Sequence, residues 1–164
     1  MPKYYIMLVD EERQEMRVPV KALLNPYNGR NAFCAGMPQF FGGTDDDDQP
    51  PPAVLENEIT QESRRTLELT SDSPPHFFDS GNMSFYWAEE GRWTETGTAW
   101  GPGQGPEEQE MDRIVTVDLT QFENALIAEL IRQTGSQGAP QHGKDDFDRS
   151  VTREAFIALL RMLL

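Results

Sequence analysis

Two glutamates one helical turn apart are the residues of this sequence best suited to chemistry. Glu58 and Glu62 lie in the stretch NEITQES, which follows a Gly-Gly pair at 42–43 and an acidic loop. Carboxylates four residues apart on a helix can point at one cation, and Mg²⁺ prefers hard oxygen ligands of this kind. Such a cation neutralises phosphate charge and activates water. The same spacing also occurs on many solvated helix faces, so the pair alone predicts a candidate metal site and no more.

Two further segments carry polar or aromatic side chains that a site could use. The run EEQEMD at 107–112 precedes an apolar stretch, and Trp100 lies in a Gly-rich loop at 96–106 that we expect to be flexible. Aromatic faces stack on any base, whereas aromatics at strand spacing usually belong to a core. Trp100 is therefore the candidate for contact with a nucleobase. The four aspartates 45–48 lack the spacing and glycine of a calcium loop, and we interpret them as a solvated insertion.

The charge balance restricts the class of partner. The 164 residues include 14 Lys and Arg against 28 Asp and Glu, which gives 14 − 28 = −14. A field of this sign repels a phosphate backbone, so direct binding to nucleic acid is disfavoured. No apolar stretch approaches the roughly 20 residues that span a bilayer, and the N-terminal segment turns acidic too early for a signal peptide. We therefore expect a cytoplasmic protein that does not contact a membrane.

The thiol and imidazole residues offer no ligand cluster. A single cysteine, Cys34, excludes an internal disulfide and a Cys-based zinc site, and we expect it to be buried. His76 and His142 lie far apart in Pro- or Gly-rich sequence, so we assign neither a role. Any metal site must therefore be built from oxygen ligands.

The elements that must position the glutamates follow from hydrophobic patterning, and the length favours a single domain, 1–164. Strands are predicted at 4–9, 15–20, 39–41 and 114–119, with two more forming a hairpin within 77–93. Helices are predicted at 53–69, at 121–134 with a Thr120–Glu123 capping box, and at 152–164. Loops are predicted at 44–52, which should be exposed, at 96–106, and at 135–148.

The spacing around Glu58 resembles the Nudix box, in which a glycine is followed at a set interval by Arg-Glu-aliphatic-x-Glu-Glu-x-Gly. Counting from Gly43, the register places Glu58, Ile59 and Glu62 on matching positions without gaps. The match is degenerate. Four positions depart from the pattern, namely Gln49 for the loop glutamate, Asn57 for the arginine, Gln61 for a glutamate and Arg64 for the closing glycine. The order of elements after the helix also resembles the ADP-ribose and sugar-nucleotide pyrophosphatases of this family.

The resemblance implies a fold and a site. The fold is α/β, a Nudix-type α/β/α sandwich with a mixed central sheet. The implied ligands of Mg²⁺ or Mn²⁺ are Glu58, Gln61, Glu62, Glu108 and a backbone carbonyl of Gly42 or Gly43. Glu58, Glu62 and Glu110 would be the catalytic acids, with the acids at 108 and 110 reaching the metals or orienting the water.

Three functions remain open. The first is a metal-dependent hydrolase that cleaves the pyrophosphate of a nucleoside diphosphate linked to another group, such as ADP-ribose or a sugar nucleotide. The second is a Nudix-fold module that binds a nucleotide or regulates without turnover, which the changes at Asn57 and Gln61 suggest. The third is an acidic module that binds a basic protein, supported by net charge alone. For the first, the expected partner is a small nucleoside diphosphate compound, and a homodimer is left open.

Overall fold

The computed structural model describes residues 1–123 and 125–164. Within these residues the main sheet is mixed and has six strands. The strand order is β5-β6-β1-β2-β8, and β3 pairs with the first half of β1. β6 runs parallel to β1, whereas β2 and β3 run antiparallel to it, and a second small sheet pairs β4 with β7. The strands are β1 (Lys3–Asp10), β2 (Glu15–Lys21), β3 (Phe41–Thr44), β4 (Leu67–Leu69), β5 (His76–Ser80), β6 (Met83–Ala88), β7 (Trp93–Glu95) and β8 (Met111–Asp118).

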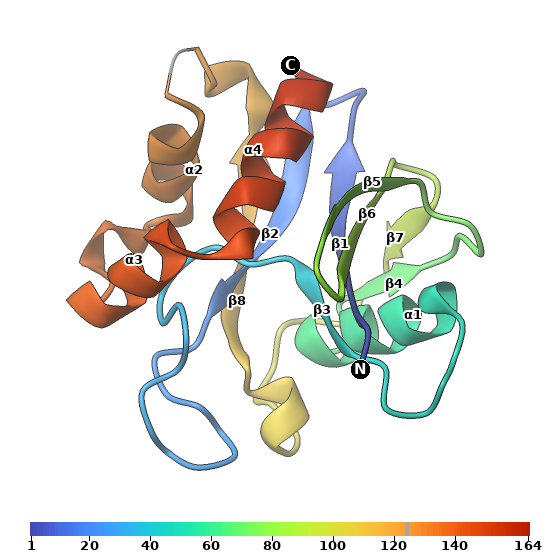
Figure 1. Cartoon of the computed structure of the whole chain (residues 1–164). Helices are drawn as coiled ribbons and strands as arrows, with labels where there is room; N and C mark the ends of the chain where they lie inside the picture. Colours follow the sequence, from blue (N-terminus) through green and yellow to red (C-terminus); the bar gives the residue numbers. More distant parts are fainter. Residues whose placement is uncertain (124) are drawn as a thin grey trace.

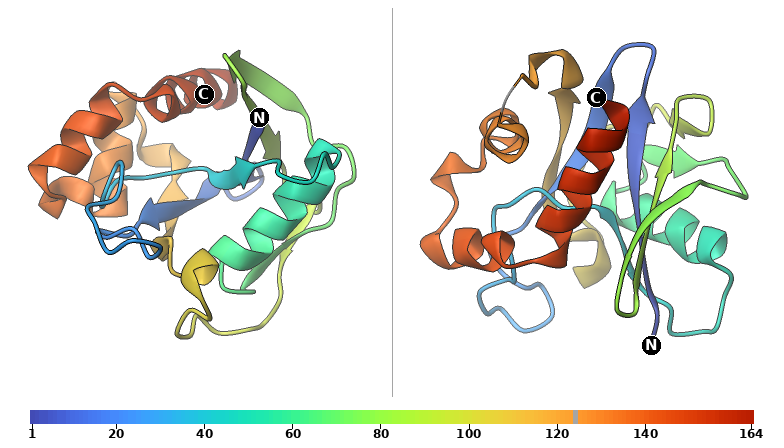
Figure 2. Two further views of the ribbon diagram at one scale, coloured as in Figure 1. Left: turned by 60° about the horizontal axis from the view of Figure 1, so that its bottom comes forward. Right: turned by 45° about the horizontal axis from the view of Figure 1, so that its top comes forward.

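Helices cover both faces of this sheet. The α-helices are α1 (Pro51–Glu62), α2 (Leu126–Thr134), α3 (Gln141–Asp148) and α4 (Val151–Leu163). Three single-turn 3₁₀ helices are η1 (Pro106–Glu108), η2 (Leu119–Gln121) and η3 (Ser136–Gly138). Figures 1 and 2 show α2 and α4 on one side of the sheet, and α1 with the β4-β7 sheet on the other. This layering confirms the predicted α/β class and mixed central sheet.

Strand β1 explains why there are two cores. Consecutive side chains of a strand point to opposite faces. Met7 and Val9 pack in the core beneath α2 and α4, whereas Ile6 and Leu8 pack beneath α1, and all four are fully buried. A strand covered on both faces has a continuous apolar sequence, as the run YYIMLV does. β1 is therefore the central element on which both helix layers rest.

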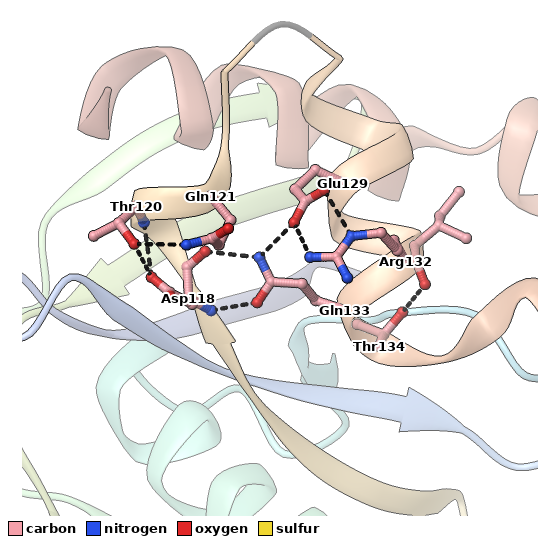
Figure 3. Close-up of polar contacts among 8 residues, drawn as sticks. Asp118, Thr120, Gln121, Glu129, Arg132, Gln133 and Thr134 are labelled. Carbon is pink, nitrogen blue, oxygen red and sulfur yellow. Dashed lines mark hydrogen bonds and ion pairs between the residues drawn. The ribbon is translucent and has the colours of Figure 1, made fainter.

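Polar contacts fix α2 to the end of β8 (Figure 3). The side-chain amide of Gln133 donates to Asp118 O at 2.7 Å and accepts from Asp118 N at 2.5 Å. Asp118 Oδ1 in turn accepts from Thr120 N at 2.9 Å. These bonds satisfy backbone groups where β8 ends, and they orient α2 so that Leu130 enters the core.

The strands predicted at 4–9, 15–20 and 114–119 are confirmed, as is the hairpin of β5 and β6. The helix predicted at 152–164 is α4, whose Phe156 and Leu160 are buried while Leu163 is partly buried. Ser150 caps it by accepting from Arg153 N at 3.1 Å. Cys34 is buried, as expected.

Predictions for the segment around α1 were wrong at its ends. The helix begins at Pro51 rather than residue 53 and ends at Glu62 rather than Leu69, because residues 64 and 65 turn the chain out of the helix and β4 then pairs with β7. The strand predicted at 39–41 lies at Phe41–Thr44, so the Gly-Gly pair is inside it. Asp45 is buried, its Oδ1 accepting from Gln49 N at 2.9 Å, so the loop at 44–52 is not wholly solvated.

Two other predictions fail in the C-terminal third. The helix predicted at 121–134 starts at Leu126 without a side-chain cap, and Asp118 rather than Thr120 caps the preceding turn, so the proposed capping box does not form. Position 124 of that range lies outside the described residues. The loop predicted at 135–148 contains η3 and α3, because Gly143 packs so closely on Ala35 that a Cβ would meet its carbonyl oxygen. None of the described helices has the length and apolar character that crossing a bilayer requires.

Candidate functional site

Helix α1 presents its two glutamates at the edge of its buried face. Leu55 and Ile59 anchor the helix on the sheet and are fully buried. Glu58 and Glu62 follow at i+3 of each anchor, so they lie beside the packed stripe rather than opposite it. Pro51 supports the helix start, because the missing N–H of a proline costs nothing in the first turn. The anchors thus hold both carboxylates over strand β3.

Glu62 is a buried carboxylate. Its residue is 2% exposed, and its Oε1 accepts from Gly42 N at 2.8 Å. Burial raises the pKa of Glu62 well above its usual range, and the charges of Glu58 and Glu110 raise it further, whereas the Gly42 hydrogen bond and the charge of Lys21 lower it. A buried acid with two acidic neighbours gains stability from any cation that reaches it.

Glu58 lies against Gly43. A Cβ at position 43 would be 2.6 Å from Glu58 Oε1, so a larger residue there would displace the carboxylate. Burial, followed by the charges of Glu110 and Asp46, raises the pKa of Glu58 to about 7. The contact places the glycine of the resembled box against its first helix glutamate.

Glu110 approaches the helix acids from another segment. It lies between η1 and β8, and its backbone carbonyl accepts from Ala22 N at 3.0 Å. The carboxylate is close enough to raise the pKa values of Glu58 and Glu62. It also contributes, after burial and the two helix acids, to the rise in the pKa of Tyr5 to about 12. The carboxylates of Glu58 and Glu62 on α1 and of Glu110 before β8 therefore lie close enough for their charges to interact.

A cavity of about 440 Å³ opens beside these acids. Glu62 and Glu110 line one side, together with the Gly42 and Gly43 backbone. The first residues of α4 also line the cavity, and the dipole of this helix favours anions. The other lining side chains are the cations Lys3, Lys21 and Arg149, the polar Gln39, and the apolar Tyr5, Phe33, Phe40, Met83 and Met111. Carboxylates, cations and aromatic rings thus surround one space.

Glu58 faces a second cavity of about 340 Å³ that is strongly acidic. Asn57 and Gln61 line it too, so the helix presents one acid and two amides to this side. The loop residues Asp45, Asp46 and Asp47 also line it, with Glu107 and Tyr27 completing the wall. The aspartate run therefore faces the candidate site at its first three residues, which the interpretation as a solvated insertion did not anticipate.

The donor chemistry of the site fits a hard divalent cation. Glu58 brings carboxylate oxygens to Gly43 and Glu62 to Gly42, and burial together with neighbouring acids raises the pKa of both carboxyls. Within residues 1–123 and 125–164, no three His, Cys, Asp or Glu side chains stand close enough together to enclose a metal ion. The acids are thus gathered at the distance where their charges interact, without a closed coordination shell.

Two residues predicted for the site are engaged elsewhere. The Oε1 of Glu108 accepts from Gln104 N at 3.0 Å and lies 3.6 Å from Arg65 Nη2. Trp100 lies beneath the guanidinium of Arg64, with Cζ 4.3 Å from the ring centroid. Neither side chain lines the cavity that holds Glu62 and Glu110.

Sequence reasoning missed the basic side of the cavity. Lys3 comes from β1, Lys21 from β2 and Arg149 from the connection between α3 and α4, and no spacing in the sequence relates them. Tyr27 was missed as well. Burial, then the charge of Glu110 and hydrogen bonding to it, raise the pKa of Tyr27. Lys21 at the end of a predicted strand carried the best available signal, because a cation closing an apolar strand lies at the edge of the sheet.

Known protein structures share this architecture, although comparison by sequence finds no relative. No protein-family model and no curated protein sequence matches the chain. A solved hydrolase of ADP compounds shares 9% identity, and the likeness covers 99% of this chain and 74% of that one with a TM-score of 0.54. An ADP-ribose pyrophosphatase from Streptococcus suis (12% identity, 91% and 92% covered, TM-score 0.43) and a MutT Nudix hydrolase from Burkholderia pseudomallei (14%, 81% and 98%, 0.44) are also similar.

The chain has the Nudix fold. In this Nudix fold, α1 and β3 carry the segment that resembles the box, and Gly43 meets Glu58 across it. A likeness at 9% identity establishes the fold, whereas the reaction depends on the chemistry of the site.

Proposed function

We propose that this chain is a metal-dependent pyrophosphohydrolase that cleaves the diphosphate of a nucleoside diphosphate linked to another group, such as ADP-ribose or a sugar nucleotide. The observation that carries the proposal is the cavity of about 440 Å³ that unites two carboxylates with three cations and several apolar side chains. A diphosphate compound needs each of these: acids for the metal, cations for the phosphates and apolar faces for a base or sugar.

Each residue has a role in this scheme. Glu58 and Glu62 would hold Mg²⁺ or Mn²⁺ with a backbone carbonyl of Gly43, and the amide oxygen of Gln61 would be a further donor. When bound, the metal neutralises phosphate charge and lowers the pKa of a coordinated water. Glu110 takes the proton of the attacking water at a carboxylate oxygen as the new bond to phosphorus forms. The bridging P–O bond breaks, and the leaving phosphate oxygen keeps the electron pair.

The basic side of the cavity binds the rest of the substrate. Lys21 and Arg149, with the N-terminal turn of α4, line the same cavity as the acids and can neutralise a phosphate that the metal does not reach. Phe33 is 65% exposed at the rim and offers a ring face to a nucleobase. The substrate thus contacts acids, cations and aromatic rings within one cavity.

A nucleotide-binding module without turnover is the second candidate. The amides Gln49, Asn57 and Gln61 all line the acidic cavity where the resembled box carries charged residues. Fewer charges hold a metal less tightly, which favours binding over catalysis.

A screen of nucleoside diphosphate compounds with Mg²⁺ or Mn²⁺ distinguishes the two candidates. Released phosphorylated product measures turnover, and calorimetry measures binding. Glu62→Gln should abolish turnover, whereas Glu56→Gln, on the exposed face of the same helix, should not change it. Turnover that survives excess chelator would contradict the metal mechanism, and tight binding without turnover would favour the second candidate.

A further inference from the structure

One guanidinium at the end of α1 holds the loop that carries Glu110. Arg64 Nη1 donates to Gly101 O at 2.8 Å, Nε donates to Glu108 O at 2.8 Å, and Nη2 donates to Met111 O at 3.1 Å. The last two carbonyls bracket Glu110 in the chain. A single side chain thus fastens the 101–111 segment at three points, and it does so from the helix that bears Glu58.

The backbone at this position is unusual for a residue with a side chain. Arg64 has φ 52° and Arg65 has φ 66°, both in the left-handed region that a Cβ disfavours. In the resembled box, position 64 is a glycine, which adopts this conformation without cost. This chain keeps the left-handed turn and carries a long cation where glycine would suffice. Strain of this kind persists where surrounding contacts determine the conformation, here the three carbonyls.

We propose that Arg64 is a positioning residue that sets Glu110 against the helix acids Glu58 and Glu62, an inference that rests on the proposed function. The planar guanidinium directs its N–H groups in fixed directions, so bonds to three carbonyls define where the loop lies. Loss of these bonds frees Glu110 to move relative to α1. Misplacement of a reacting group by about 1 Å costs on the order of 100-fold in rate.

The neighbouring Arg65 provides a matched control. It shares the left-handed backbone, but its side chain is 43% exposed and its contacts go to side chains. Its Nη1 donates to Gln104 Oε1 at 3.1 Å, and its Nη2 lies 3.6 Å from Glu108 Oε1. Arg65→Gly therefore relieves the same backbone strain without releasing the carbonyls that bracket Glu110.

The experiment compares wild type, Arg64→Gly, Arg64→Lys and Arg65→Gly by three measurements. Hydrogen exchange of the 101–111 amides in metal-free protein measures how firmly the loop is held. Calorimetry with Mn²⁺ alone measures how tightly the acids bind the cation. Steady-state kinetics reports the reaction. We expect Arg64→Gly to remain folded, to exchange faster in this loop, to bind Mn²⁺ more weakly, and to lose roughly 10–100-fold in kcat. Its substrate KM should change by less than about threefold, because the cations that bind phosphate are elsewhere.

Arg64→Lys should not restore these properties, since one ammonium group cannot donate to three carbonyls in the directions that the guanidinium does. Arg65→Gly should show a smaller effect in every measurement. Unchanged loop exchange in Arg64→Gly would overturn the inference, as would faster exchange with unchanged Mn²⁺ affinity and kcat. If wild type turns over no diphosphate compound, the proposed function fails separately, and the difference in Mn²⁺ affinity still decides the role of Arg64. If wild type also fails to bind Mn²⁺, both proposals fall.

Discussion

Replacing Glu58 by glutamine tests the electrostatics of the site while keeping its shape. Burial, and then the charges of Glu110 and Asp46, raise the pKa of Glu58 from 4.5 to about 7 in the folded chain. A group whose folded-state pKa is raised binds its proton more tightly in the folded protein than in the unfolded one. Its contribution to stability is complete below the unfolded pKa and is lost as the pH rises through the folded pKa. Metal-free wild type should therefore lose stability between about pH 4.5 and pH 7.

The magnitude follows from the two pKa values. Each pKa unit corresponds to about 1.36 kcal/mol, so the rise from 4.5 to about 7 gives a ceiling of about 3 kcal/mol. The Glu58 side chain is partly exposed, and solvent screening reduces this ceiling. We expect metal-free wild type to lose roughly 1–2 kcal/mol more than Glu58→Gln over this pH range.

Urea denaturation in chelator at several pH values measures the difference. Glu56→Gln is the matched control, because it removes one charge from the exposed face of the same helix and therefore corrects for the change in net charge. Adding Mn²⁺ near neutral pH should stabilise wild type more than Glu58→Gln, since the cation pairs with the ionised carboxylate. Identical pH dependence in all three proteins would refute the electrostatic argument for this site.

Four further outcomes are expected. Glu62→Gln should lower turnover at least ~100-fold, measured as product release at saturating Mg²⁺; a wild-type rate would remove Glu62 from the site. Gln61→Glu should lower the metal concentration for half-maximal rate without changing substrate choice, and unchanged metal titrations would show that position 61 points away from the metal. Lys21→Ala should raise KM more than it lowers kcat, and the reverse pattern in initial rates would contradict a binding role. Excess chelator should abolish hydrolysis, restored by Mn²⁺ in the same assay.

Apolar patterning predicted the elements that form the cores. The run YYIMLV could be assigned to a doubly buried strand, and the Phe156 and Leu160 spacing to a helix, because burial imposes those patterns directly. The end of α1 could not be predicted in this way. Residues 53–69 contain no glycine or proline, yet two arginines in left-handed conformation end the helix, and the contacts that hold them lie 37 to 47 residues further along.

Some residues of the candidate site could likewise be predicted from the sequence, and others could not. Glu58 and Glu62 are four residues apart, so helical geometry relates them from sequence alone. Lys3, Lys21 and Arg149 meet only because β1 and β2 are neighbours in the sheet and α4 begins beside them. Pairing register and helix placement carry that information, and neither is encoded in any local spacing.

The same geometry gives a physical reason for the amides of the degenerate box. The charge of Glu58 already raises the pKa of Glu62, and a third helix carboxylate at position 61 would add to that repulsion. Gln61 avoids this cost and keeps an oxygen donor, while Asp46 brings a carboxylate to Glu58 from the preceding loop. A loop acid can move away when no cation is present, whereas a helix acid cannot. The loop at 44–52 can therefore supply the negative charge that the helix lacks when a cation binds. For this reason we expect Gln61→Glu to tighten metal binding rather than to create activity where none exists.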